Sequence, residues 1–314
     1  MAALGANLGI ALTKFIAALL TGSSSMVAEA IHSVADSGNQ LLLLLGGRQA
    51  RKRPTAEHPF GYGRERYIYA FIVSIVLFTV GGLFALYEAY HKGHELHDTH
   101  GHPENSLLDS RWWWVPIVVL LAAIVMESLS FRTAIRETAL VKGDSSYVQY
   151  VRRAKQPELP VILLEDFAAL IGLFFALLGV GLSLLTDNLW FDVIGTALIG
   201  LLLVAVAAVL AIETQSLLIG ESAGAAAEQQ ISDAITATPG IDRIVHLKTL
   251  HLGPDELLVA AKVAVPPSAT APDVAETIDA AEVAIRTAQP IARVIYLEPD
   301  IYRPDPTREA PEPT

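Results

Sequence analysis

The feature that most constrains this chain is a set of six apolar stretches, each about 20 residues long, which is enough to cross a bilayer as an α-helix. They cover residues 4–21, 24–47, 67–90, 112–131, 159–185 and 189–211. The mean hydropathy of +0.43 is also too high for an ordinary soluble domain. We therefore expect a polytopic α-helical membrane protein with six transmembrane helices over residues 1–217.

Basic residues predict which way this bundle lies across the membrane. Twelve of them follow the second and fourth stretches, whereas two lie in the loops on the opposite side. The first group is Arg48, Arg51, Lys52, Arg53, Arg64, Arg66, Arg132, Arg136, Lys142, Arg152, Arg153 and Lys155; the second is Lys92 and Arg111. Because cytoplasmic loops carry the excess of Lys and Arg, both termini are predicted to be cytoplasmic. We expect the cytoplasmic membrane of a bacterium, with no secretory signal, since no basic segment precedes the first apolar run.

The pattern changes after the last apolar stretch. Residues 225–238 and 271–287 have helical periodicity, whereas residues 241–252, 256–265 and 292–297 alternate as strands do. We therefore expect a small cytoplasmic α+β domain over residues 218–300, with one sheet and helices on one face. Residues 301–314 are rich in proline and charge, which predicts a disordered tail.

The second apolar stretch carries an acid–imidazole–acid stripe made of Glu29, His32 and Asp36. At about 100° per residue, these three side chains fall within about 60° of one another on one helix face. Each ionisable group at bilayer depth costs at least about 2.5–3.5 kcal/mol, so the stripe calls for a functional explanation. A divalent cation or a proton held inside the membrane is the simplest one.

The fifth stretch supplies further ligand groups, because Glu165 and Asp166 open onto a long apolar run. His32, Asp36 and Asp166, with Glu165 or a water molecule, would form a mixed nitrogen and oxygen set of the kind that zinc accepts. The chain has no cysteine, which excludes a thiolate site. Alternatively, the Glu165–Asp166 pair is an interfacial charge favoured by the helix dipole. Glu127, in the fourth stretch, is a candidate for the vestibule.

Other polar residues in the spans have more than one interpretation. Glu29 is a metal ligand, a proton acceptor, or the partner of Lys14, which is the only Lys or Arg inside the first stretch. The pairing with Lys14 is slightly favoured. Asn7 and Asn39 either bridge helices or line the same cavity, as a second shell or a proton relay. Asp192 is expected at the membrane interface.

Histidines are concentrated after the third stretch. Five of the nine lie there: His91, His94, His97, His100 and His102. Such a tract is typical of weak, flexible metal binding, although a merely polar loop is the alternative. The predicted orientation places it on the face opposite the cytoplasm.

Charge and site chemistry exclude several classes of function. The net charge of −11 argues against nucleic acid as a partner. An intramembrane metal enzyme would reuse the His32 site around a water nucleophile, but no general acid and base beside a substrate-sized opening are evident. We therefore expect no enzymatic activity and no resident cofactor.

Three motifs resemble those of one family. They are GSSSMVAEAIHSVADSGNQ at residues 22–40, HPFGYGR at residues 58–64 and EDFAALIG at residues 165–172. With them the chain resembles the cation diffusion facilitators over nearly its whole length. The resemblance implies six spans, a ferredoxin-like cytoplasmic domain, a homodimer, and exchange of cytoplasmic metal for protons by alternating access.

The family's intramembrane site takes two ligands four residues apart from each of two spans. In the second span these positions match His32 and Asp36, and in the fifth span Asp166 matches. The position four residues before Asp166 is Ile162, which cannot bind a metal. The resemblance suggests that Glu165 substitutes for it, as in the branch of the family that has this Glu-Asp pair.

Two further family sites are poorly matched. The loop after the second span offers His58 and Glu57, but Tyr62 stands where another histidine is expected. The soluble domain has only His246 and His251, so a multi-metal dimer interface is not expected there.

The sequence thus predicts a divalent-cation efflux transporter that exchanges metal for protons. Zinc is the expected cargo, with Mn²⁺, Fe²⁺ and Co²⁺ as alternatives, since their ligand preferences overlap. The alternative function is a membrane-embedded metal-sensing or partner-binding protein without flux. A proton-only channel is a third reading.

Overall fold

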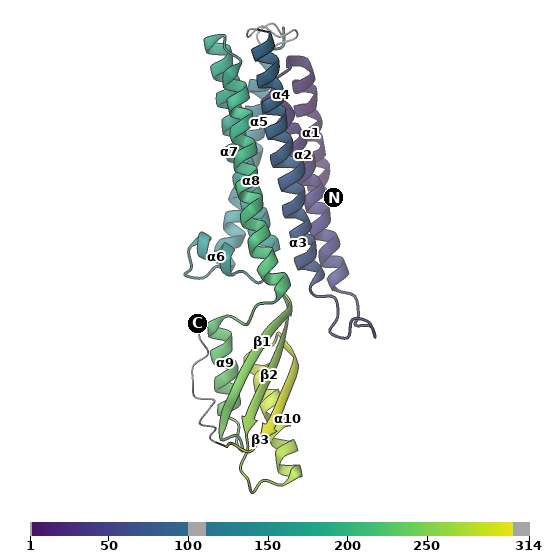
Figure 1. The fold of residues 1–314 in the computed structure, drawn as a ribbon, viewed down its shortest axis with the longest axis vertical. Helices are drawn as coiled ribbons and strands as arrows, with labels where there is room; N and C mark the ends of the chain where they lie inside the picture. The colour runs from purple at the N-terminus through teal and green to yellow at the C-terminus, as the bar shows by residue number, and fades with distance from the viewer. Residues whose placement is uncertain (1, 100–110, 304–314) are drawn as a thin grey trace. The chain divides into compact units, whose positions relative to one another are not determined.

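The computed structural model describes residues 2–99 and 111–303 and separates the chain into two compact units (Figure 1). One unit joins Met1–Lys52 with Glu65–Ser216, and the other joins Arg53–Arg64 with Leu217–Thr314. Within the described residues, the first unit is helical and the second contains a three-stranded sheet. This is the expected fold class of a helical membrane domain followed by a small α+β domain.

Most helices of the helical unit are long (Figure 1). Its helices are α1 (Ala2–Thr21), α2 (Ser24–Ala50), α3 (Glu65–Val76), α4 (Phe84–Asp98), α5 (Val115–Val141), α6 (Tyr147–Arg153), α7 (Glu158–Thr186) and α8 (Trp190–Ile219). A π-helical stretch, η1 (Leu77–Leu83), connects α3 to α4 without a break. Each of the six apolar stretches is therefore helical over most of its length, with residues 112–114 and 189 in turns.

Among the described residues, four helices are long and apolar enough to cross a membrane. They are Glu65–Asp98, Val115–Val141, Glu158–Thr186 and Trp190–Ile219. The polar stripe lowers the mean hydropathy of α2, and the described apolar part of α1 is Ala11–Thr21. The chain is thus an integral membrane protein, whereas spanning by α1 and α2 remains a prediction.

The α+β unit has the predicted order of elements: α9 (Ala225–Thr236), β1 (Arg243–Gly253), β2 (Glu256–Ala264), α10 (Ala271–Ala288) and β3 (Ala292–Asp300). β2 is the central strand, antiparallel to β1 and parallel to β3. The parallel pair requires a crossover, which α10 supplies. Apolar residues of both helices and all three strands form the core of this unit.

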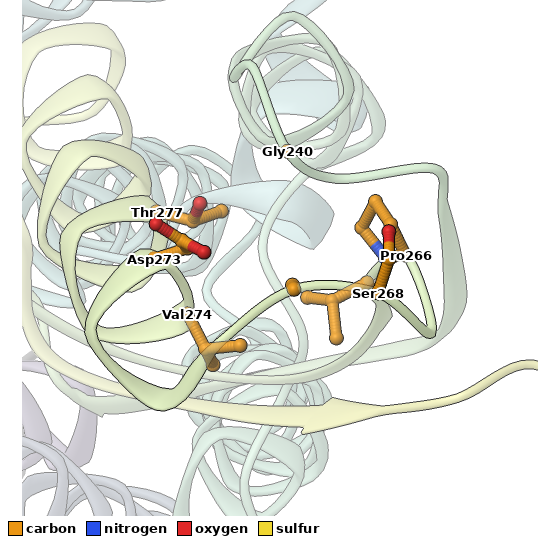
Figure 2. Close-up of a pocket in the computed structure, with 8 residues that line it drawn as sticks. Gly240, Pro266, Ser268, Asp273, Val274 and Thr277 are labelled. Atoms are coloured by element: carbon orange, nitrogen blue, oxygen red, sulfur yellow. The ribbon is translucent and has the colours of Figure 1, made fainter.

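A shallow hollow of about 250 Å³ lies at the start of α10 (Figure 2). Asp273 lines it, but its carboxylate already accepts hydrogen bonds from Thr270, through the backbone N–H at 2.9 Å and the hydroxyl at 2.6 Å. The first of these bonds, together with the bond from Asp273 N to Thr270 Oγ1 at 3.5 Å, forms the capping box that begins the helix. Gly240, on the rim, has φ +90°, and a Cβ there would lie 2.5 Å from Thr277 Oγ1, so only glycine fits. The residues of this hollow therefore serve the local fold.

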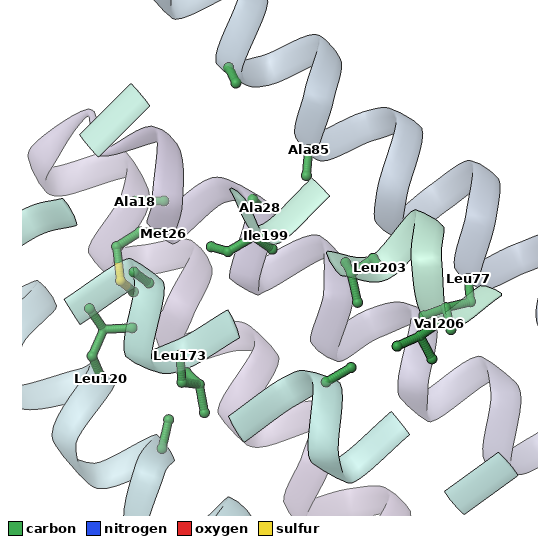
Figure 3. Packing of buried hydrophobic residues seen from close by; sticks show 14 of the residues in the cluster. Ala18, Met26, Ala28, Leu77, Ala85, Leu120, Leu173, Ile199, Leu203 and Val206 are labelled. Atoms are coloured by element: carbon green, nitrogen blue, oxygen red, sulfur yellow. The ribbon is translucent and has the colours of Figure 1, made fainter. Parts of the chain in front are cut away.

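The core of the helical unit is built from alanines and leucines contributed by most of its long helices (Figure 3). Small residues let α7 and α8 approach closely. A Cβ on Gly179 would lie 3.0 Å from Phe191 O, and one on Gly195 would lie 2.9 Å from Phe175 O. Close approach of this kind favours helix association in membranes. The same packing encloses the polar residues of α2.

Candidate cation site

The helix that carries the polar stripe is anchored at its first turn by a carboxylate from α8. Ser23 is the N-cap of α2, and Asp192 Oδ2 accepts hydrogen bonds from Ser24 N at 2.8 Å and Ser24 Oγ at 3.1 Å. Asp192 is 3% exposed, so it is buried among the helices, and its expected depth at the membrane interface stays a prediction. The free N–H groups and the dipole at a helix N-terminus attract an acid, and a neighbouring helix supplies it here.

His32 and Asp36 lie together on α2 as predicted. The imidazole is buried, and its Nδ1 is 3.5 Å from Asp36 Oδ1. Neither imidazole nitrogen, nor Asp36 Oδ1, has a hydrogen-bond partner among the described residues. Buried polar atoms are nearly always paired, because an unpaired one loses its interaction with water and gains nothing. These atoms are therefore available to a cation, a proton or water.

The imidazole of His32 faces the π-helical stretch of the third span. A Cβ built on Gly81 of η1 would lie 3.9 Å from His32 Nδ1 and 3.2 Å from Leu203 Cδ1. The absence of a side chain at Gly81 thus keeps space beside the imidazole. π-helical turns are rare and occur frequently at functional sites. The glycines Gly81 and Gly82 are visible in the sequence, but no sequence pattern predicted that this part of the span is π-helical.

Glu165 contacts α2 through Asn39. Asn39 Nδ2 donates to Glu165 Oε1 at 2.6 Å, and both side chains are buried. Asn39 lies almost two helical turns after His32, so this bond joins α2 to α7 on the Arg48 side of the stripe. Asn39 thus bridges two helices, one of its two expected positions, while its role in a second shell or a proton relay stays a prediction.

Asp166 faces a different neighbour from Glu165, since adjacent helical residues are about 100° apart. Ser130 Oγ of α5 donates to Asp166 Oδ2 at 2.8 Å. The carboxyl groups of Asp36 and Asp166 are still close enough to interact electrostatically. Glu127 of α5 belongs to the same group of interacting carboxyls.

The four expected ligands are therefore present in one region but are not gathered into a coordination shell. In residues 2–99 and 111–303, no three His, Asp or Glu side chains are close enough together to hold a metal ion. The structure instead contains the pairs His32–Asp36, Asn39–Glu165 and Ser130–Asp166. Side chains from α7 must move toward α2 before all four can contact one ion.

Glu29 is paired with Lys14, the interpretation that the sequence slightly favoured. Lys14 Nζ lies 2.9 Å from Glu29 Oε2 and 2.8 Å from Ser33 Oγ, and both charged side chains are almost fully buried. Glu29 Oε1 points toward Gly172 of α7, where a Cβ would lie 3.0 Å from it. Glu29 is thus held one helical turn before His32. The side chain of Asn7 lies outside the described residues.

The histidine-rich segment is helical up to Asp98, whereas we expected a flexible loop after Tyr90. Side-chain pairs one turn apart support this extension: Lys92 with Glu95 at 2.8 Å and His94 with Asp98 at 2.9 Å. His100 and His102 lie outside the described residues.

Comparison with known proteins identifies the family. The family model for the cation efflux transmembrane domain matches residues 1–219. The chain belongs to the cation efflux family. This confirms the resemblance to cation diffusion facilitators, while the branch with a Glu-Asp pair remains a prediction.

Several relatives of known name are similar to this member of the cation efflux family. The proton-coupled zinc antiporter SLC30A9, mitochondrial, of Xenopus laevis is 34% identical over 253 residues, which cover 80% of this chain and 43% of that protein. The Homo sapiens protein of the same name is 33% identical, over 76% of this chain and 41% of its own length. Magnetosome protein MamM of Paramagnetospirillum magneticum is 23% identical, over 80% of this chain and 72% of its own. The chain spans less than half the length of the SLC30A9 proteins.

A solved MamM-CTD structure is also similar, at 18% identity and a TM-score of 0.24, over 24% of this chain and 96% of that one.

Proposed function

We propose that this protein is a divalent-cation efflux transporter that exchanges a cytoplasmic metal ion, zinc in the first instance, for protons. The observation that carries the proposal is the buried His32–Asp36 pair, in which both imidazole nitrogens and Asp36 Oδ1 have no hydrogen-bond partner among the described residues. Membership of the cation efflux family supports the same conclusion. The proton-coupled zinc antiporters among the relatives support zinc over the other candidate ions.

In this mechanism the metal ion is the cargo. His32 supplies an imidazole nitrogen and Asp36 a carboxylate oxygen from α2. When the bundle changes conformation, Asp166 and Glu165 of α7 give up their hydrogen bonds to Ser130 and Asn39. They then bind the cation together with His32 and Asp36. Protons compete with the metal for the same lone pairs, so exposure of the site to a more acidic compartment releases the ion. Metal and proton therefore cross in opposite directions.

We propose a domain organisation and an orientation to match. Residues 1–217 form the transport domain, residues 218–300 a cytoplasmic α+β domain and residues 301–314 a tail. The excess of Lys and Arg in the loops after the second and fourth spans supports cytoplasmic termini. An export role in that orientation fits the cytoplasmic membrane of a bacterium, and we propose that the protein works as a homodimer.

The test is zinc uptake into proteoliposomes that contain the full chain and have an acidic interior. We expect uptake by the wild type and at most background uptake by His32→Ala and Asp36→Ala. His246→Ala is the matched control, because it removes an exposed imidazole from the α+β unit and is expected to transport normally. Uptake by His32→Ala at the wild-type rate would reject the site. A wild type that binds zinc without moving it would favour the sensing alternative.

A further inference from the structure

The third membrane-spanning helix is much longer than the membrane requires. The continuous helix Glu65–Asp98 has 34 residues. At about 1.5 Å per residue it extends about 51 Å, against about 30 Å for a hydrocarbon core. The helix is therefore long enough for the last turns of α4 to extend beyond the hydrocarbon core. Tyr87 and Tyr90, just before these turns, are both exposed. Tyrosines are enriched at the membrane–water interface, so these two indicate where the helix reaches it.

Two opposite edges of this last part of α4 have different roles. Ala89, Gly93 and Leu96 form the packed edge, where a Cβ on Gly93 would lie 3.5 Å from side-chain atoms of Trp190 and Val193. On the opposite edge, His91, His94 and Asp98 fall within about 60° of one another. The packed edge fixes the helix, and the other edge presents two imidazoles and a carboxylate to solvent.

The donor atoms of His94 and Asp98 already have almost the spacing of two ligands on one metal ion. His94 Nδ1 lies 2.9 Å from Asp98 Oδ2, and the side chains are 62% and 60% exposed. In a tetrahedral zinc site with bonds of about 2.0–2.1 Å, neighbouring donor atoms are about 3.3 Å apart. Metal binding in place of this ion pair would widen the distance between the two donor atoms by a few tenths of an ångström.

The surroundings favour a cation at this position. A surface hollow of about 310 Å³ is lined by Tyr90, His91, His94, Glu95, Asp98 and Thr99. The ring of Tyr87 stacks on that of His91, with centroids 6.0 Å apart, which holds the second imidazole on the same edge. The end of α4 also adds the partial negative charge of a helix C-terminus. Lys92 is the nearby cation, and it is paired with Glu95 at 2.8 Å.

We propose that His94 and Asp98 form a second binding site for a divalent transition-metal ion such as zinc, separate from the site inside the membrane. Water molecules complete the shell, and His91 joins it after rotation about its side-chain bonds. No three ligating side chains are gathered here in the described residues, so the site is a two-residue chelate in this conformation. If the protein exports metal as proposed above, the site receives the released ion; the binding itself does not depend on transport.

The test is a count of zinc ions bound per chain, measured by equilibrium dialysis of the full-length protein in lipid nanodiscs against a series of zinc concentrations. We expect His94→Gln combined with Asp98→Asn to bind one zinc ion fewer per chain than the wild type. The matched control is His97→Gln, which removes an exposed imidazole from a different face of the same turn and keeps the wild-type count. Binding should also weaken in acid, since imidazole coordinates only in its neutral form.

An unchanged count in the double variant, or an equal loss in His97→Gln, would overturn the proposal. Circular dichroism of each variant establishes that the helix is retained. His32→Ala separates the two sites: it loses the intramembrane ion but should keep the ion that His94 binds. Failure of zinc transport in the wild type would reject the proposed function. The number of zinc ions bound per chain would still test the second site.

Discussion

Replacing Lys14 by methionine should destabilise the helical unit far more than the same change at Lys92. Lys14 Nζ makes contacts of 2.9 Å to Glu29 and 2.8 Å to Ser33, and both charged side chains are buried. Removing one partner of a buried ion pair costs about 3–5 kcal/mol, because the other charge is left buried and unpaired. That loss corresponds to a change of about 100- to 4000-fold in the folding equilibrium.

The double variant Lys14→Met with Glu29→Gln identifies the cause of the loss. Removing both charges leaves no uncompensated ion, so we expect most of the stability to return. The comparison variant is Lys92→Met, which breaks the partly buried pair with Glu95 one turn away on the same helix and should cost about 0.2–1 kcal/mol.

The measurement is unfolding in mixed detergent micelles, monitored by circular dichroism as the denaturing detergent is increased. The reasoning is refuted if Lys14→Met is no less stable than Lys92→Met. It is equally refuted if the double variant is as unstable as Lys14→Met alone, since the loss would then come from packing of the lysine stem.

Three more predictions follow from particular contacts. Gly81→Val should lower zinc transport, because a side chain there fills the space beside His32, whereas Gly181→Val has open space around it and should transport normally; proteoliposome uptake compares them. Asp192→Asn should lower stability by about 0.5–2 kcal/mol through loss of the charged cap on α2, and Asp187→Asn, at an exposed position, should be neutral in the same unfolding assay. Hydrogen bonds from Thr270 hold the pKa of Asp273 below its ordinary value of 3.8. This stabilisation is therefore present at neutral pH and is lost as the pH falls through the lowered pKa of the folded state. Amide hydrogen exchange at the start of α10, corrected for the intrinsic rate, should show that acid loss in the wild type and no such pH dependence in Asp273→Asn.

Much of the fold could be predicted because the responsible signals are local. Apolar runs of about 20 residues gave the long helices, and alternation gave the strands of the α+β unit. The pairing of Glu29 with Lys14 was also accessible, since the first span has no other basic residue. An acid inside the second span therefore has few partners other than the single base of the neighbouring first span.

The features that sequence reasoning missed depend on contacts between distant helices. Nothing near Asp192 indicates that it caps α2, because its partners Ser23 and Ser24 are about 170 residues earlier in the chain. Asp166 accepts a hydrogen bond from Ser130, and Glu165 accepts one from Asn39. Both bonds depend on how α5, α7 and α2 pack together. The helix continues beyond Tyr90 because pairs one turn apart stabilise a segment whose composition resembles a loop.

The same difference between local signals and contacts of distant helices applies to the site inside the membrane. His32 and Asp36 share one helix, so their proximity follows from spacing alone. Contact with the carboxylates of α7 requires a particular arrangement of two helices, and in this conformation those carboxylates bind neighbouring polar groups instead.

The most direct test of the account is simultaneous recording of zinc and proton movement in the same proteoliposomes. A zinc-sensitive dye and a pH-sensitive dye inside the vesicles would follow both ions after zinc is added outside. The account predicts that the wild type moves protons outward as zinc enters, and that His32→Ala loses both signals together. Zinc entry without proton movement, or both signals intact in His32→Ala, would contradict it.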